Sequence, residues 1–239
     1  MSKICIFAIF IVPLSKFLVL LGSFLFCDKM SVLENLTAIK MLQLKALKFQ
    51  LNNPFKWANG WSAPVYCDDR KILSYPKIRN FIRVELSRVI AEMYPDADVI
   101  AGVATNAIAH GVLVAEQLSL PFVYVHPTPK DHGLENLIEG DLRPGMKVVV
   151  VEDLISTGGS SLKAVQAIRN NGCEVIGMVA SYTYGFDVAE KAFADADVEL
   201  ITLTNYEAVL EVALETGYIT EDELPLLNDW RRDPSHWNQ

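Results

Sequence analysis

The sequence predicts an α/β fold, in which a parallel sheet is flanked by helices and preceded by a small N-terminal hood. From Val99 onward, short apolar runs alternate with amphipathic helical patterns, which is the order expected of βαβ units. Four of the five apolar runs are rich in Val and Ile and are bounded by Gly, Pro or Asp, as expected of strands buried on both faces. Residues 55–76 do not follow this alternation and carry a turn signal at Asn59-Gly60, so we expect them to belong to the hood.

The strands and helices can be assigned from their two periodicities. The predicted strands are residues 99–104, 122–125, 147–152, 175–181 and 199–203. The predicted helices, each with apolar side chains at helical spacing, are residues 77–93, 107–118 and 161–170. Gly172 follows the last of these helices and predicts its C-terminal cap. We expect the helices to cover both faces of the sheet.

Size and composition restrict the class of protein. The 239-residue chain is long enough for one substantial domain, because single hydrophobic cores usually stop growing near about 250 to 300 residues. A formal net charge of −8, without a cluster of Lys and Arg, argues against a nucleic-acid partner. The four cysteines lack the C-x-x-C spacing of a zinc site, and scattered single thiols indicate a reducing, cytoplasmic location.

The N-terminal segment differs from the rest of the chain. Residues 4–26 form a nearly continuous apolar run, which is long enough to span a bilayer because about 20 residues suffice. Lys16, near the middle of the run, and Pro13 both oppose a membrane-spanning helix. No small-residue cleavage motif closes the run, so a secretory signal peptide is poorly specified as well.

A third explanation for this segment is that translation begins at Met30. We therefore treat residues 1–29 as an apolar extension and residues 30–239 as the functional domain, with the hood at about residues 30–76. Attachment to a membrane is expected only if the extension is translated and retained.

Residues 148–161, VVVVEDLISTGGSS, place a candidate phosphate-binding loop directly after a buried strand. In an open α/β sheet, ligands bind outside the carboxyl ends of the strands. Gly158 and Gly159 let the backbone approach a ligand closely, and free N–H groups at the start of the next helix favour an anion. Four hydroxyl groups add further donors, those of Ser156, Thr157, Ser160 and Ser161.

Glu152 and Asp153 stand between the strand and this loop. Carboxylates repel phosphate, but they suit ribose hydroxyls as acceptors, or a Mg²⁺ ion held between hydroxyls and pyrophosphate. The nucleotide P-loop requires a Lys after its last Gly, where this chain has Ser160, and the dinucleotide fingerprint G-x-G-x-x-G is missing. A phosphate site beside a diol site predicts a phosphorylated ribose as the ligand.

The same segment resembles the motif with which type I phosphoribosyltransferases bind 5-phosphoribosyl-1-pyrophosphate (PRPP). That motif is a hydrophobic strand, two acidic residues, two spacers, Thr or Ser, any residue, Gly, and then Thr, Gly or Ser. The resemblance implies a parallel sheet with a hood over a base pocket, and displacement of pyrophosphate from Mg²⁺-PRPP by a base nitrogen. It assigns PRPP binding to Glu152, Asp153, Leu154, Ile155, Ser156, Thr157, Gly158, Gly159 and Ser160. The Mg²⁺ cofactor would be carried by PRPP, with no direct protein ligand.

Residues 124–139 form a long connection without a periodic pattern, which is typical of an active-site lid. The connection carries His126, Lys130 and His132. Lys130 and His132 could neutralise a leaving pyrophosphate, whose charge increases as its bond to the ribose carbon breaks.

Lys-Asp-His-Gly, residues 130–133, resembles the flexible loop of orotate phosphoribosyltransferases. Residues 60–76 resemble the hood of that family, and the resemblance extends from about Met30 to the C-terminus. It implies transfer of phosphoribose to orotate in UMP synthesis, by a homodimer whose lid loop is shared between subunits. The resemblance implies that the catalytic residues are Lys130, His132 and Asp153. It adds three residues of the lid, His126, Lys130 and His132, to those that bind PRPP. The residues implied to bind orotate are Tyr66, Cys67, Ser156 and Tyr184.

The chain departs from the family pattern at three positions, two of them among these site residues. The family usually has an Arg where this chain has His126, which is shorter and largely neutral at pH 7. Some members have a Lys in place of Asn106 and a base-contacting Arg in place of Tyr184. The candidates for holding the orotate carboxylate are therefore the backbone amides near Tyr66 and Cys67, the Ser156 hydroxyl and Arg70.

Two alternatives to orotate transfer remain open from the sequence. The same sheet could serve a purine or uracil as acceptor, against which the Lys-Asp-His-Gly lid argues. The chain could also be a non-catalytic PRPP-sensing protein, for which His126 is the motive.

Overall fold

The computed structural model describes residues 30–57, 59–126 and 137–237. The apolar extension and the lid residues Lys130 and His132 lie outside these ranges, so the predictions made for them remain predictions. Within the described ranges, none of the helices is both long enough and apolar enough to cross a membrane.

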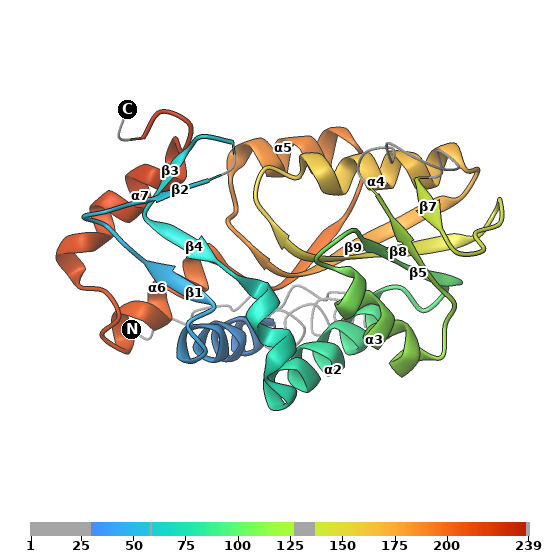
Figure 1. The fold of residues 1–239 in the computed structure, drawn as a ribbon, viewed down its shortest axis with the longest axis horizontal. Helices are drawn as coiled ribbons and strands as arrows, with labels where there is room; N and C mark the ends of the chain where they lie inside the picture. The colour runs from blue at the N-terminus through green and yellow to red at the C-terminus, as the bar shows by residue number, and fades with distance from the viewer. Residues whose placement is uncertain (1–29, 58, 127–136, 238–239) are drawn as a thin grey trace, which may run out of the picture.

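The chain alternates strands and helices through most of its length (Figure 1). The strands are β1 Leu47–Phe49, β2 Phe55–Lys56, β3 Ser62–Ala63, β4 Val65–Cys67, β5 Val99–Val103, β6 Phe122–Val125, β7 Ile138–Glu139, β8 Lys147–Ile155, β9 Glu174–Thr183 and β10 Leu200–Asn205. The helices are a helix over residues 30–43, the 3-10 helix η1 Asp69–Ser74, α2 Pro76–Met93, α3 Ile108–Leu118, α4 Gly159–Asn170, α5 Asp187–Asp195, α6 Tyr206–Glu215, the 3-10 helix η2 Glu221–Glu223 and α7 Leu224–Arg232.

Six strands form the central sheet in the order β10-β9-β8-β5-β6-β7. All neighbouring pairs are parallel except β6 and β7, which pair antiparallel. Helices α4 and α5 cover one face of this sheet, and α2 and α3 cover the other (Figure 1). The predicted α/β fold with a flanked, mostly parallel sheet is confirmed.

Alternating side chains of β8 explain why both faces need a covering layer. Val148 and Val150 belong to the hydrophobic cluster under α4, whereas Val149 and Val151 belong to the cluster on the opposite face. All four are fully buried. A strand with no polar face can be stable only between two helical layers, which is the expected property of a parallel sheet.

The predicted elements agree with the structure except at their ends. Strand β8 was predicted to end at Glu152, but it continues to Ile155 because its last residues pair with β9, Leu154 opposite Tyr182 and Ile155 opposite Thr183. Gly172 follows α4 with φ at +80°, the left-handed conformation expected of a residue that closes a helix. Helices α5, α6 and α7 were not predicted.

Two small strand pairs lie in the N-terminal segment beside the main sheet (Figure 1). Strand β1 pairs antiparallel with β4, and β2 pairs antiparallel with β3. At the predicted turn, Gly60 has φ at +88°, and the Trp57 amide donates a hydrogen bond to the Trp61 carbonyl at 2.9 Å. This N-terminal segment, up to the end of η1, is the hood.

Close packing between α2 and the sheet depends on the absence of a side chain at Gly177. A Cβ atom added there would overlap the ring of Tyr94, which follows α2 and lies against β9. Tyr94 is fixed from its other end, because its hydroxyl donates a hydrogen bond to Glu199 at 3.0 Å.

We therefore predict that Gly177→Ala lowers the free energy of unfolding by about 1 to 3 kcal/mol, the usual cost of overpacking a core. Urea denaturation measures this value. Gly159→Ala is the matched control, because the nearest atom to its added Cβ is 4.0 Å away. Equal effects of the two substitutions would contradict the packing role of Gly177.

Candidate functional site

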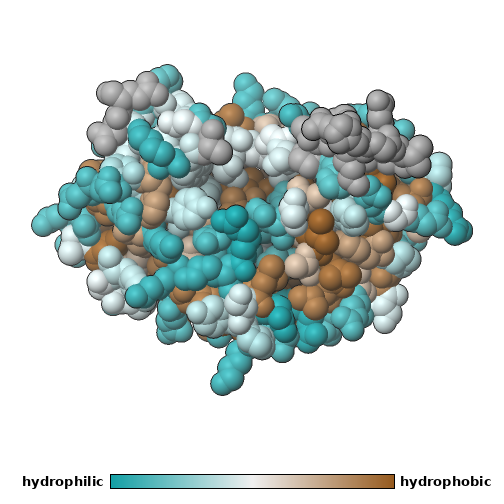
Figure 2. Space-filling model, in the orientation of Figure 1, coloured by the Kyte–Doolittle hydropathy of each residue, from teal (hydrophilic) through white to brown (hydrophobic). Residues whose placement is uncertain are grey.

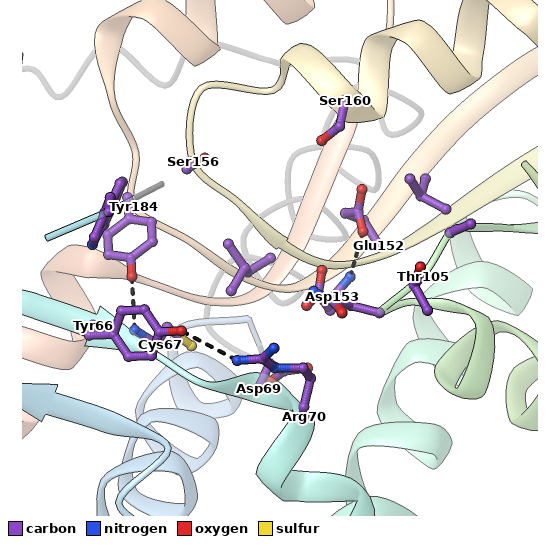
Figure 3. A pocket seen from close by; sticks show the side chains of 15 residues that line it. Tyr66, Cys67, Asp69, Arg70, Thr105, Glu152, Asp153, Ser156, Ser160 and Tyr184 are labelled. Atoms are coloured by element: carbon purple, nitrogen blue, oxygen red, sulfur yellow. Dashed lines mark hydrogen bonds between the residues drawn. The ribbon is translucent and has the colours of Figure 1, made fainter. Parts of the chain in front are cut away.

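A pocket of about 310 Å³ opens at the carboxyl ends of β5 and β8, where the hood faces the main sheet (Figure 3). Hydrophilic residues gather across the middle of the molecular face shown in Figure 2. The hood contributes Trp57, Tyr66, Cys67, Asp69 and Arg70; the β5–α3 junction contributes Val103, Ala104, Thr105 and Asn106; and β8, the start of α4 and the end of β9 contribute Glu152, Asp153, Leu154, Ser156, Ser160 and Tyr184.

The pocket exists because β8 is longer than its neighbour β5. The pairing of β8 with β5 ends where Val151 lies opposite Gly102, but the pairing with β9 continues to Ile155. Glu152 and Asp153 therefore lie on a strand that has a partner on only one side. The sequence predicted that the strand ends at Glu152, whereas the structure places Asp153 in the strand as well, so the sheet backbone holds both carboxylates.

Glu152 is a buried carboxylate with defined hydrogen bonds. Its Oε2 accepts a hydrogen bond from the Ser161 hydroxyl at 2.8 Å, and its Oε1 accepts one from the Asp153 amide at 3.1 Å. Burial, reinforced by the charge of Asp153, raises the pKa of Glu152 well above its usual value. Ser161 was expected to offer its hydroxyl to a phosphate, but the structure commits that hydroxyl to Glu152.

The loop between β8 and α4 places hydroxyl groups at the start of a helix. Ser156 and Ser160 line the pocket, and α4 begins at Gly159. Gly158 is left-handed, with φ at +77°, and a Cβ there would lie 2.7 Å from the Phe193 ring of α5. The glycine therefore allows a tight turn against which the Phe193 ring packs closely. The first N–H groups of α4, which follow this turn, are suited to binding an anion.

The junction between β5 and α3 forms the wall next to the acidic pair, and it was not among the predicted site residues. The peptide bond between Ala104 and Thr105 is cis, and both residues line the pocket with Asn106. A signal was available, because this is also a strand-to-helix junction and β5 is the direct neighbour of β8 in the sheet.

The hood wall is tied to the sheet by a tyrosine. The Tyr184 hydroxyl accepts a hydrogen bond from the backbone N–H of Cys67 at 2.9 Å (Figure 3). The Tyr184 ring also contacts Trp57, with the ring centroids 4.9 Å apart. Burial raises the pKa of both the Tyr184 hydroxyl and the Cys67 thiol well above their usual values, so both groups are neutral near pH 7. A neutral, aromatic wall of this kind suits a planar ring.

A buried acid and a buried histidine lie beneath the hood wall. His110 Nε2 of α3 lies 3.1 Å from Asp69 Oδ2 of η1, and both side chains are almost completely buried. The two side chains are in close contact, but their geometry does not meet that of a hydrogen bond. Burial raises the pKa of Asp69, against the opposing effect of His110.

The structure brings eight of the predicted site residues into this one pocket. They are Tyr66, Cys67, Glu152, Asp153, Leu154, Ser156, Ser160 and Tyr184.

The other predicted residues within the described ranges do not line the pocket. Ile155, Thr157, Gly158 and Gly159 belong to the same strand-loop-helix segment, but they are not part of the pocket wall. His126 is also absent from the pocket wall, and its ring packs edge-on against Tyr124, with centroids 5.6 Å apart.

Trp57 and Asp69 line the pocket but were not predicted. Their places depend on how the hood folds onto the sheet, and no local motif marks them.

Several known proteins are similar to most of this chain. A model of the phosphoribosyl transferase domain matches residues 82–216. The orotate phosphoribosyltransferase of Bacteroides thetaiotaomicron is 68% identical over 209 residues, which cover 87% of this chain and 99% of that protein. That of Porphyromonas gingivalis is 62% identical over 208 residues, with 87% and 99% covered. The crystal structure of orotate phosphoribosyltransferase from Aeropyrum pernix matches with a TM-score of 0.66 at 28% identity, covering 76% of this chain and 98% of that one.

The hydrogen bond between Tyr184 and Cys67 leads to a stability prediction. Tyr184→Phe leaves the buried Cys67 N–H without its acceptor, so we expect it to lower the free energy of unfolding by about 1 to 3 kcal/mol. Tyr182→Phe is the control, because the Tyr182 hydroxyl is buried and has no hydrogen-bond partner among the described residues. Urea denaturation should show a cost for Tyr184→Phe and a neutral or stabilising effect for Tyr182→Phe. The reverse order would contradict the role given to Tyr184.

Proposed function

Since the chain belongs to the orotate phosphoribosyltransferases, we propose that it transfers phosphoribose from PRPP to orotate. The products are orotidine 5′-phosphate and pyrophosphate, in the pyrimidine pathway that leads to UMP. The observation that carries the proposal is that one pocket combines the acidic pair, the hydroxyl-bearing start of α4 and an aromatic hood wall.

The β8–α4 segment would bind the phosphoribosyl group. The hydroxyls of Ser156 and Ser160, with the N–H groups at the start of α4, suit the 5′-phosphate. Glu152 and Asp153 offer carboxylate oxygens to the ribose hydroxyls. Because Ser161 already donates to Glu152 Oε2, the orientation of that carboxylate is fixed before the ligand arrives.

The hood wall would bind orotate. Tyr66, Cys67 and Tyr184 line this side, and Ser156 lies between it and the phosphate end. The Tyr184 oxygen accepts from Cys67, and no acceptor for its own proton occurs among the described residues. Because the pKa of Tyr184 is raised, its hydroxyl stays protonated. It can therefore donate a hydrogen bond to a carbonyl or carboxylate oxygen of the base.

Mg²⁺ fits this pocket as an ion carried by the substrate. Among the described residues, no group of three or more His, Cys, Asp or Glu side chains could hold a metal. Mg²⁺ often binds substrate phosphates, so PRPP would bring the ion into the pocket, while Glu152 and Asp153 act on the ribose hydroxyls and not as direct metal ligands. The ion would neutralise charge on the pyrophosphate while the protein orients the ribose.

Residues outside the described ranges complete the proposal. Lys130 and His132 would neutralise the departing pyrophosphate, with His126 at the base of the lid, and the lid would exclude water that could hydrolyse PRPP. We also propose that the enzyme is a cytoplasmic homodimer whose lid acts across the subunit interface. Cys67 and Cys173 are free thiols, which agrees with a reducing compartment.

The experiment that tests the proposed function is an assay of the purified full chain with orotate, PRPP and Mg²⁺, with adenine, hypoxanthine and uracil in parallel. We expect orotate absorbance to fall only when both PRPP and Mg²⁺ are present, with little product from the other bases. Preferred turnover of another base would overturn the assignment of the acceptor. Binding of PRPP without turnover of any base would overturn the assignment as an enzyme.

The raised pKa of Glu152 predicts the pH dependence of PRPP use. When the pH is lowered, a carboxylate with a raised pKa becomes protonated at a higher pH than an ordinary glutamate does. The protonated carboxyl is a weaker hydrogen-bond acceptor for the ribose hydroxyls than the carboxylate is. The kcat/KM for PRPP should therefore fall on acidification in a range above the usual glutamate pKa. Glu152→Gln should lower kcat/KM by about tenfold to 100-fold at pH 8 and remove this acid limb.

Glu116→Gln, at an exposed position on α3, is the control and should preserve the profile. An unchanged acid limb in Glu152→Gln would show that another group is responsible.

A further inference from the structure

The C-terminal helix α7 makes two long-range attachments next to the pocket. The indole Nε1 of Trp230 donates a hydrogen bond to the carbonyl of Ser62 in β3 at 3.2 Å. Arg231 donates to the carbonyl of Gly185 from Nε at 3.2 Å and from Nη2 at 2.9 Å. One helix therefore holds both the β2–β3 hairpin of the hood and the turn that follows β9, and Figure 1 shows α7 beside this hairpin.

Trp230 also supports two of the three aromatic residues that line the pocket. It is fully buried, and its ring meets those of Trp57 and Tyr184 edge-on, with centroids 5.9 Å and 5.8 Å apart. Phe186 and Tyr206 complete the cluster, with centroids 5.4 Å and 5.6 Å from Trp230. Close-packed aromatic rings transmit changes in position, because protein interiors leave few voids in which they could relax.

Arg231 fixes the turn directly after Tyr184. Gly185 adopts φ of +62°, and a Cβ there would lie 2.9 Å from Arg231 Nη2, so the glycine permits the close approach of the guanidinium. A second contact, from Arg231 Nη1 to Glu207 Oε1 at 2.5 Å, anchors the guanidinium to α6. The two parallel donors of an arginine define the direction of the carbonyl more strictly than a single donor could.

We propose that Trp230 and Arg231 are positioning residues that set the affinity of the pocket for the acceptor base. They hold Trp57 and Tyr184 in place from behind, without contacting the substrate. This inference rests on the proposed transfer to orotate, and it adds the C-terminal helix to the determinants of base binding.

The effect should be confined to the base half of the pocket. No hydrogen bond or ion pair within the described residues joins α7 to the β8–α4 segment that would bind PRPP. Loss of the α7 attachments should therefore raise the KM for orotate and leave the KM for PRPP unchanged. A general loss of folded structure would instead affect both substrates.

Arg231→Gln is the first test. We expect the KM for orotate to rise about fivefold to tenfold, in line with the loss of one strong hydrogen-bonding contact, and the KM for PRPP to change less than about twofold. Arg231→Lys, which keeps one donor, should recover part of the orotate affinity. Arg232→Gln is the matched control, because Arg232 lies on the same helix and its side chain is 76% exposed. Within the described residues, its one ion pair is with Asp229 of the same helix, at 3.4 Å.

Trp230→Phe is the second test, because it keeps an aromatic ring but removes the donor to Ser62. It should raise the KM for orotate selectively, as Arg231→Gln does. An orotate KM within twofold of the unmodified enzyme in both variants would overturn the proposal. So would a parallel rise of both KM values together with a lower melting temperature, since that pattern indicates a purely structural role. Failure of the unmodified enzyme to use orotate would instead refute the proposed function.

Discussion

The continuation of β8 beyond the end of its pairing with β5 is the constraint on which the site depends. From Glu152 to Ile155, β8 continues to pair with β9 while its other edge is open. Backbone pairing on one side makes the segment rigid, and the missing partner on the other side leaves room for a ligand. The acidic pair, the turn at Gly158 and the start of α4 all take their positions from this half-paired segment.

Rigid placement has an electrostatic cost. Glu152 and Asp153 are 4% and 5% exposed, and adjacent buried carboxylates are unfavourable for folding. The hydrogen bond from Ser161 offsets part of this cost at Glu152, but the pKa of Glu152 remains raised. Hydroxyl donors or a cation arriving with a substrate would favour the ionised form, so binding in this pocket should lower the pKa of Glu152. The electrostatic free energy of the acidic pair is thus less favourable in the empty pocket than in the occupied one, as is common at functional sites.

Local features of the sequence were sufficient for the sheet and for half of the site. Residues 148–151 are continuously apolar, the acidic pair follows them directly, and the Gly-Gly turn comes after four more residues, so this half could be predicted from one segment. The other half depends on contacts between distant segments. Trp57 reaches the pocket because the hood folds over the sheet, and the bond between Trp230 and Ser62 joins residues 168 positions apart. His126 follows β6, as predicted for the lid connection, and its ring packs against Tyr124, a contact that residue type alone could not indicate.

The central claim is that one pocket holds the phosphate at α4, the ribose at the acidic pair and the base at the hood. A crystal structure of the chain with orotidine 5′-phosphate tests it most directly. We predict the 5′-phosphate within hydrogen-bonding distance of Ser156 or Ser160, the ribose hydroxyls facing Glu152 and Asp153, and the base between the Tyr66–Cys67 backbone and Tyr184. A phosphate bound away from the start of α4, or a base bound toward Thr105 with the hood wall empty, would contradict it.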